Sequence, residues 1–125
     1  MTASRNGYPH LGSVTVTEMG AGRLISLDRQ VAEDLTIDIS AQMLVILTSV
    51  KQRLADFDAH PSHILSVRID LADASGYQET MQIWTAWAAL GRVAVRATVV
   101  LLAQSRGPLV EVTIVAAFTP QQRQH

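Results

Sequence analysis

The sequence contains no cysteine among its 125 residues. This absence excludes a disulfide framework, a thiolate nucleophile and a cysteine-ligated zinc site. It agrees with a reducing compartment. Residues 1–9 also lack the basic segment and apolar run that form a signal peptide. We therefore expect a cytoplasmic protein.

Strong net charge and long hydrophobic runs are missing as well. The formal net charge is -1, and the basic residues gather on no segment, which argues against nucleic acid as a partner. The longest apolar stretch, residues 93–103, is interrupted by Arg96 and is too short to cross a bilayer. We expect neither nucleic acid nor a membrane as a partner.

Common catalytic and metal-binding motifs are also absent. No Gly-x-Ser-x-Gly occurs, and the glycines at 20–22 are followed by neither a Gly-x-Gly-x-x-Gly pattern nor a Walker lysine. His60 and His63 lie near Asp56 and Asp58, but their spacing matches no standard zinc site. A solvated turn and no metal are therefore expected there.

The composition supports one folded domain. Hydrophobic residues make up 48% of the chain, which is enough for one core, and 125 residues leave no room for two domains. We expect a single domain over residues 1–125, with 1–12 and 119–125 as loose ends.

Hydrophobic periodicity predicts the first half of the fold. Residues 13–18 alternate as in a strand, and residues 23–27 are expected to return beside them. From Asp38 onward apolar residues recur at spacings of three and four, as on one face of a helix. Asp38, or Thr36 before it, can cap that helix. The 60–62 turn, with Pro61, is expected to end it.

The second half repeats the alternation of helix and strand. Residues 64–72 predict a strand that turns one apolar face, Leu65 included, toward helices. Ser75 and Gln78 have the spacing of a helix-capping box, and Gly91 suits the end of that helix. Residues 93–103 and 109–118 are strongly β-forming, and the turn at 104–108 by itself suggests a hairpin.

The resulting order is β-β-α-β-α-β-β. Two helices alternating with strands predict an α+β fold in which both helices cover one face of a single sheet. Trp84 and Trp87, at helical spacing, are expected in the core or an interface, because aromatic side chains carry much of any buried area.

Two charged residues stand inside β-forming segments. Arg96 is either exposed on the open sheet face beside an acid or a clamp for an anion, since a guanidinium grips a carboxylate through two parallel hydrogen bonds. Glu111 either pairs with Arg96 or Arg68, or orients and deprotonates a water molecule.

Several segments together resemble the Rid/YjgF family over residues 13–118. Residues 38–42 (Asp-Ile-Ser-Ala-Gln) resemble the opening of its first helix, and residues 96–99 (Arg-Ala-Thr-Val) resemble its "R-x-T-V" strand. Residues 109–112 (Leu-Val-Glu-Val) resemble its closing "L-V-E-I" strand, and residues 30–31 its early "Q-V". The sequence is thus similar to this family in the order and spacing of its motifs.

This resemblance implies a chorismate-mutase-like fold, a homotrimer with clefts between subunits, and no cofactor. It implies hydrolysis of reactive enamines or imines, such as 2-aminoacrylate, to a 2-keto acid and ammonia. Arg96, Ala97 and Thr98 match the substrate-binding segment, with Arg96 on the carboxylate, and Glu111 matches the glutamate that positions water. In the implied sheet, the strand at 64–72 separates the last two strands.

The sequence departs from the family pattern around this site. Asp28 and Arg29 replace its "S-G", Met81 replaces a frequent asparagine, and Thr15 stands near the position of a tyrosine. These changes leave two alternatives open. One is a non-catalytic trimer that binds a small carboxylate, and the other is a related enzyme for a biosynthetic intermediate.

Overall fold

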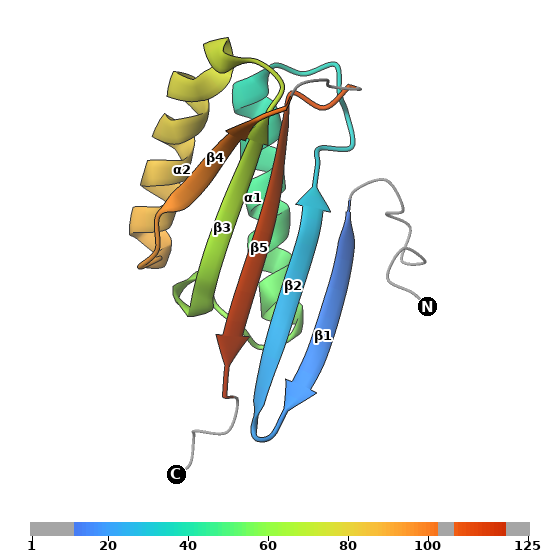
Figure 1. Ribbon diagram of the computed structural model, residues 1–125, viewed down its shortest axis with the longest axis vertical. Helices are drawn as coiled ribbons and strands as arrows, with labels where there is room; N and C mark the ends of the chain where they lie inside the picture. The colour runs from blue at the N-terminus through green and yellow to red at the C-terminus, as the bar shows by residue number, and fades with distance from the viewer. Residues whose placement is uncertain (1–11, 103–106, 120–125) are drawn as a thin grey trace.

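The structure is a computed structural model that describes residues 12–102 and 107–119. Its elements follow the predicted order, with five strands and two α-helices in the described part of the chain (Figure 1). They are β1 (Ser13–Met19), β2 (Gly22–Gln30), α1 (Ile39–Asp56), β3 (Ile64–Leu71), α2 (Tyr77–Gly91), β4 (Ala97–Leu101) and β5 (Val110–Phe118). The predicted loose ends, apart from residues 12 and 119, and most of the 104–108 turn lie outside the described residues.

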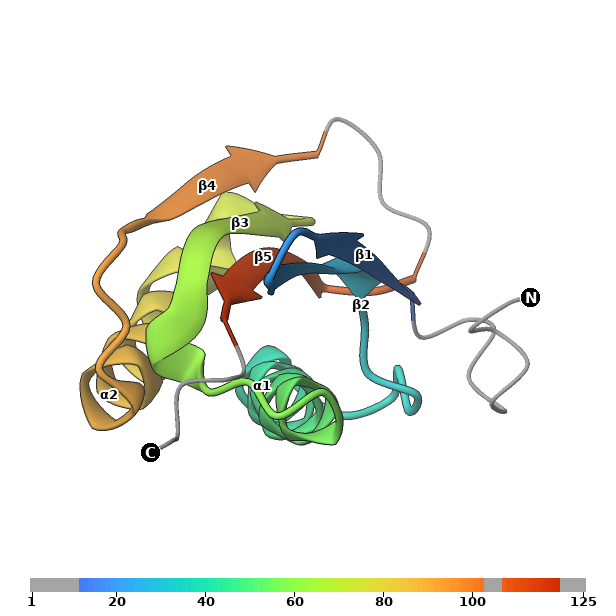
Figure 2. The same cartoon turned by 90° about the horizontal axis from the view of Figure 1, so that it is seen from below.

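Both helices cover one face of a single sheet, whereas no described helix covers the other face (Figure 2). The predicted α+β class, with two helices on a mixed β-sheet in a chorismate-mutase-like arrangement, is therefore confirmed. The core lies between sheet and helices and includes Ile25, Leu27, Met43, Ile46, Leu47, Leu54, Ile69, Leu71 and Ile114.

The strand order is β1-β2-β5-β3-β4. β3 pairs antiparallel with β5 and parallel with β4, so the last two strands are not neighbours. The hairpin that the turn at 104–108 suggests is therefore wrong, and the arrangement implied by the resemblance holds. Parallel neighbours need a long crossover, and α2 supplies it between β3 and β4.

The first helix begins as predicted but ends earlier. The Asp38 carboxylate accepts a hydrogen bond from the Ala41 N–H at 2.9 Å, so Asp38 is the cap. Thr36 instead donates to the Asp34 carboxylate. The helix ends at Asp56, before the turn at Pro61, and Asp58 follows in a left-handed conformation (φ 64°) that reverses the chain.

The predicted capping box of the second helix is wrong. Ser75 lies in a short 3-10 helix, where its N–H donates to Asp73. α2 then starts at Tyr77 after Gly76, with no side-chain cap. At the other end Gly91 is the last helical residue, as expected. The left-handed position that closes the helix belongs to Arg92, with φ 59°.

Two strand predictions also need correction. β3 carries a bulge between Ile64 and Ser66, so Leu65 leaves the apolar row and is exposed. An extra residue in one strand shifts the alternation of faces by one position. β4 begins only at Ala97, so Arg96 precedes the strand instead of lying within it.

The two tryptophans pack on the helical side of the sheet. Trp84 is buried in the core, and Trp87 is partly buried against it. Their ring centroids lie 5.7 Å apart in a tilted arrangement, within the usual range of aromatic pairs. The expected core role is thus confirmed for Trp84.

A histidine turn joins α1 to β3. His63 Nδ1 accepts a hydrogen bond from the His60 backbone N–H at 2.9 Å, and the His63 ring stacks on Phe118 at 5.1 Å. His60 is exposed as expected for a solvated turn, whereas His63 is half-buried. Desolvation, together with the neighbouring His60, lowers the pKa of His63 below its usual 6.5.

Two leucines one turn apart on α1 test the position of the core. Leu47 is 1% exposed, whereas Leu44 is 54% exposed. We expect Leu47→Ala to lower the free energy of unfolding by about 2–5 kcal/mol, because it removes buried methyl groups and leaves a cavity. Leu44→Ala should change it by less than about 0.5 kcal/mol. Urea unfolding of both variants would contradict this core if the two losses were equal.

The histidine turn should make stability depend on pH. A folded-state pKa below the unfolded value means that the folded chain binds fewer protons, so stability falls as the pH drops through about 6.5. Protonation also removes the Nδ1 lone pair that accepts the His60 N–H. We expect the midpoint of thermal unfolding to fall between neutral pH and about pH 5.5, and His63→Gln to reduce this slope. Equal slopes in both proteins would exclude His63 as the cause.

Candidate functional site

The open face of the sheet carries a pair of acidic side chains on neighbouring strands. Asp70 of β3 and Glu111 of β5 are register partners. Both alternate with core residues, so both side chains stand on the face that the helices leave open. Each is nevertheless largely covered, with side-chain exposures of 8% and 10%. Like charges directly opposite one another destabilise a sheet, so this pair requires nearby cations.

Two arginines supply these cations. Arg68 Nε lies 2.8 Å from Asp70 Oδ1, and Arg29 Nε lies 3.3 Å from Glu111 Oε1. Charge-assisted contacts of this kind are usually about 2.7–2.9 Å. The Arg68–Asp70 distance lies within this range, whereas the Arg29–Glu111 distance exceeds it. The two pairs differ in exposure too: the Arg68 side chain is 54% exposed and that of Arg29 is 75% exposed. Arg29 is therefore the more loosely held of the two.

A bulge in β2 brings Arg29 to this position. The β2–β5 register shifts between Leu27 and Gln30, and Arg29 has φ 49°, in the left-handed region. Its backbone N–H donates to Thr113 Oγ1 at 3.0 Å. The buried Gln30 side chain donates hydrogen bonds to the Asp28 and Ser13 carbonyls, and these bonds stabilise the bulge. Backbone and side chain of Arg29 are thus both directed at β5.

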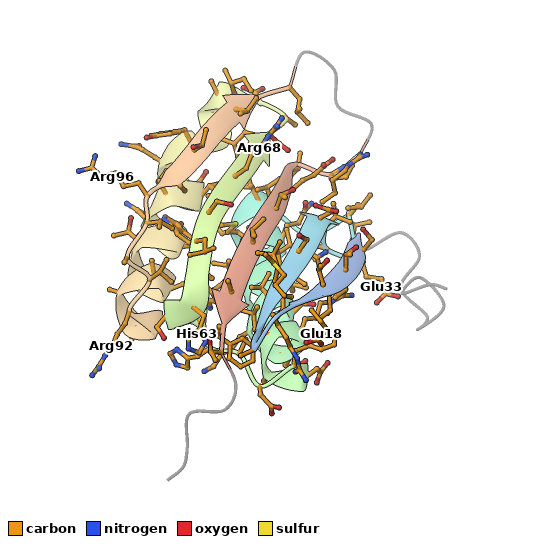
Figure 3. The ribbon with its side chains drawn as sticks, turned by 60° about the horizontal axis from the view of Figure 1, so that its bottom comes forward. Glu18, Glu33, His63, Arg68, Arg92 and Arg96 are labelled. Atoms are coloured by element: carbon orange, nitrogen blue, oxygen red, sulfur yellow. The ribbon has the colours of Figure 1, made fainter. Side chains whose placement is uncertain are left out.

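The site residues that the family resemblance implies do not lie together within one chain. Arg96 is exposed just before β4 and forms no ion pair with any described residue. Figure 3 shows it projecting outward at the β4 edge, away from Arg68. Thr98 is the register partner of Arg68 and shares its open face. Ala97 faces the other way and packs against the core.

Arg96 and Glu111 lie far apart within one chain. Asp70 is the register partner of both Glu111 and Val100, and Arg96 precedes Val100 by four residues. Four residues span about 13 Å along a strand, and two strand spacings add about 10 Å across the sheet. Of the alternatives for Glu111, pairing with Arg96 is therefore wrong, and pairing with Arg68 is wrong because Arg68 contacts Asp70 instead. Its partner is Arg29.

Sequence reasoning missed Asp70 and did not foresee the contact of Arg29. The alternation of polar residues in β3 marks Asp70 as an open-face residue, but only the register places it against Glu111. Two of the positions at which the sequence departs from the family pattern lie on other elements. Met81 packs against the core and Thr15 is exposed on β1.

The described residues contain no group of three or more His, Cys, Asp or Glu side chains that could hold a metal ion. Neither helix is long and apolar enough to cross a membrane, as judged over the part of the chain that the structure describes.

The fold and the sequence define the class of protein. Residues 14–118 match the family model described as Endoribonuclease L-PSP. The chain therefore belongs to this family, which is also known as the YjgF/YER057c/UK114 or Rid family. The resemblance noted from the sequence is thus confirmed. No curated protein matches the chain.

Solved structures of the family share the fold at low sequence identity. A YjgF family member from Neisseria meningitidis is 25% identical with a TM-score of 0.67, over 93% of this chain and 100% of that one. A YjgF/YER057c/UK114 family member from Mycobacterium tuberculosis is 18% identical with a TM-score of 0.72, over 94% and 97%. TdcF from E. coli, crystallised with bound serine, is 12% identical with a TM-score of 0.71, over 82% and 85%. This chain is a divergent member.

Proposed function

We propose that the protein is a hydrolytic deaminase of reactive enamines and imines of the 2-aminoacrylate type, active as a homotrimer without a cofactor. The observation that carries the proposal is the position of Glu111. Its carboxylate stands on the open sheet face, where one oxygen contacts Arg29 and the other has no hydrogen-bond partner among the described residues. A carboxylate held in this way has a free oxygen with which to orient water.

The chemistry needs little from the protein. The imine form of the substrate is protonated and electrophilic at the carbon beside its carboxylate. Water, with a proton accepted by Glu111, adds to that carbon, the C–N bond breaks, and ammonia leaves with the returned proton while a 2-keto acid remains. Placing the water and the imine carbon together supplies much of the acceleration.

Arg96 holds the substrate carboxylate in this proposal, and Ala97 and Thr98 flank it. Because Arg96 and Glu111 of one chain lie far apart, the two act together when Arg96 of one protomer meets Glu111 of the next. Trimeric clefts of the kind implied by the family provide this meeting. The serine bound in the TdcF crystal also carries a carboxylate next to a nitrogen-bearing carbon. That ligand supports a small carboxylate as the ligand of this protein as well.

One observation favours a second candidate, a trimer that binds a small carboxylate without catalysis. The Arg29 guanidinium contacts Glu111 and holds one of the two carboxylate oxygens that could act on water. A related enzyme for a biosynthetic imine is the third possibility, with the changed residue at position 29 as its signature.

Arg96→Ala tests the carboxylate contact. We expect keto-acid release from enzymatically generated 2-aminoacrylate to fall about tenfold to a hundredfold, because a hydrogen bond to a charged group contributes about 1.5–3 kcal/mol. Arg92→Ala is the control, since this exposed arginine closes α2 and takes no part in the site. Equal rates for wild type and Arg96→Ala would reject the assigned role of Arg96.

Glu111→Gln separates the enzyme from the binder. Glutamine keeps the size of the side chain and an acceptor for Arg29 but takes no proton, so turnover should fall about a hundredfold or more. Thermal stabilisation by 2-oxobutyrate should persist. A wild-type protein that is stabilised by 2-oxobutyrate but does not accelerate hydrolysis would instead establish the non-catalytic trimer. Light scattering gives the oligomeric state independently.

A further inference from the structure

Arg29 combines three features that a structural ion pair alone does not require. Its backbone is left-handed (φ 49°), a conformation that costs a non-glycine residue about 1–2 kcal/mol. Its Nε contact with Glu111 is long, at 3.3 Å, and its side chain is 75% exposed. Strained backbone of this kind persists where surrounding contacts hold it, and it gathers at functional sites.

The outer edge of the Arg29 guanidinium is available to a ligand. The group has five N–H donors in a fixed planar fork. One of them, on Nε, is directed at Glu111, and the terminal amino groups make no hydrogen bond to the described residues. Arg29 can therefore hold Glu111 with one edge and a second anion with the other. Arg68 is less suited, because its Nε is held at 2.8 Å by Asp70.

We propose that Arg29 binds a second carboxylate of the ligand, so that the site takes dicarboxylic 2-imino acids and their 2-keto products in preference to monocarboxylic ones. This inference rests on the proposed function, with Arg96 holding the first carboxylate. Arg29 is then the residue that determines substrate specificity, and it binds the end of the substrate remote from the reacting carbon.

The charge around Arg29 favours a carboxylate over a phosphate. Asp70 and Glu111 carry two negative charges, which Arg29 and Arg68 balance. A single added negative charge meets a guanidinium fork of matching geometry. A doubly charged phosphate would stand close to two covered carboxylates, and the repulsion grows with each added charge.

Calorimetry with matched ligand pairs tests the proposal. Oxaloacetate is compared with 2-oxobutyrate, and 2-oxoglutarate with 2-oxopentanoate, because each pair has the same chain length and differs in the second carboxylate. For wild type we expect at least one diacid to bind about tenfold more tightly than its monoacid partner. Arg29→Asn should abolish this preference, measured as the ratio of diacid to monoacid affinity, so that any general weakening of anion binding beside Glu111 affects both ligands and leaves the ratio unaffected. Asparagine tolerates the left-handed backbone at this position.

Arg92→Asn is the matched control. Arg92 is also a left-handed arginine (φ 59°), but it closes α2 and lies away from Arg68 in Figure 3. This variant should keep the diacid preference. Arg29→Lys, which keeps the charge without the planar fork, should retain part of it. An effect transmitted only through Glu111 would instead change the affinities for monoacids and diacids alike.

Equal affinity for monoacid and diacid in wild type, no binding of either, or an unchanged preference in Arg29→Asn would overturn the role of Arg29. A diacid preference without turnover would support Arg29 while contradicting the deaminase. Turnover without a diacid preference would retain the deaminase and overturn this inference.

Discussion

The contact between Arg29 and Glu111 is the interaction on which the functional account depends. It places a cation beside the Glu111 carboxylate, which lies opposite Asp70 on the neighbouring strand. Both acids can therefore remain covered on the open face. The contact also decides what Glu111 can do. A carboxylate with one oxygen held and one free is positioned for water, whereas a carboxylate gripped through both oxygens is only a structural partner.

The strand order imposes the second constraint. Because β3 lies between β5 and β4, Glu111 and Arg96 cannot share a site within one chain. A ligand that contacts both must bridge two copies. The exposed Arg96, which has no ionic partner in the described part of the chain, fits a residue whose partner arrives from outside. In the proposed function, the sheet that stabilises the chain thus also separates the two residues of the site.

Periodicity was sufficient to predict the type of each element and its order along the chain. Alternating residues, three-and-four spacing and the cap at Asp38 report local preferences, and these preferences survive in the folded chain. The order of the last strands in the sheet does not follow from the local sequence. A short connection at 104–108 fits a hairpin as well as a sheet in which β3 lies between β4 and β5. Only the family resemblance pointed to the correct order. The bulge at Leu65 shows the same limit, since one inserted residue reverses the exposed face without any signal in the alternation.

The candidate site was less predictable for a related reason. Glu111 stood out because it is charged within a β-forming segment, but its partner depends on the register of β2 against β5 and on the bulge at Arg29. An arginine in a left-handed conformation contradicts the residue preference for that conformation. Sequence patterns favour glycine or asparagine at such a position, so the contact at Arg29 became visible only when the strands were placed side by side.

The central claim is that the working site joins Arg96 of one protomer to Glu111 of another. Subunit complementation tests it directly: Arg96→Ala and Glu111→Gln chains are co-expressed, and imine hydrolysis by the mixed oligomer is compared with that of each variant alone. Random mixing should leave about a quarter of the inter-subunit sites with both native residues, so activity should return to about that fraction of wild type. A mixed oligomer as inactive as its parents would contradict the account.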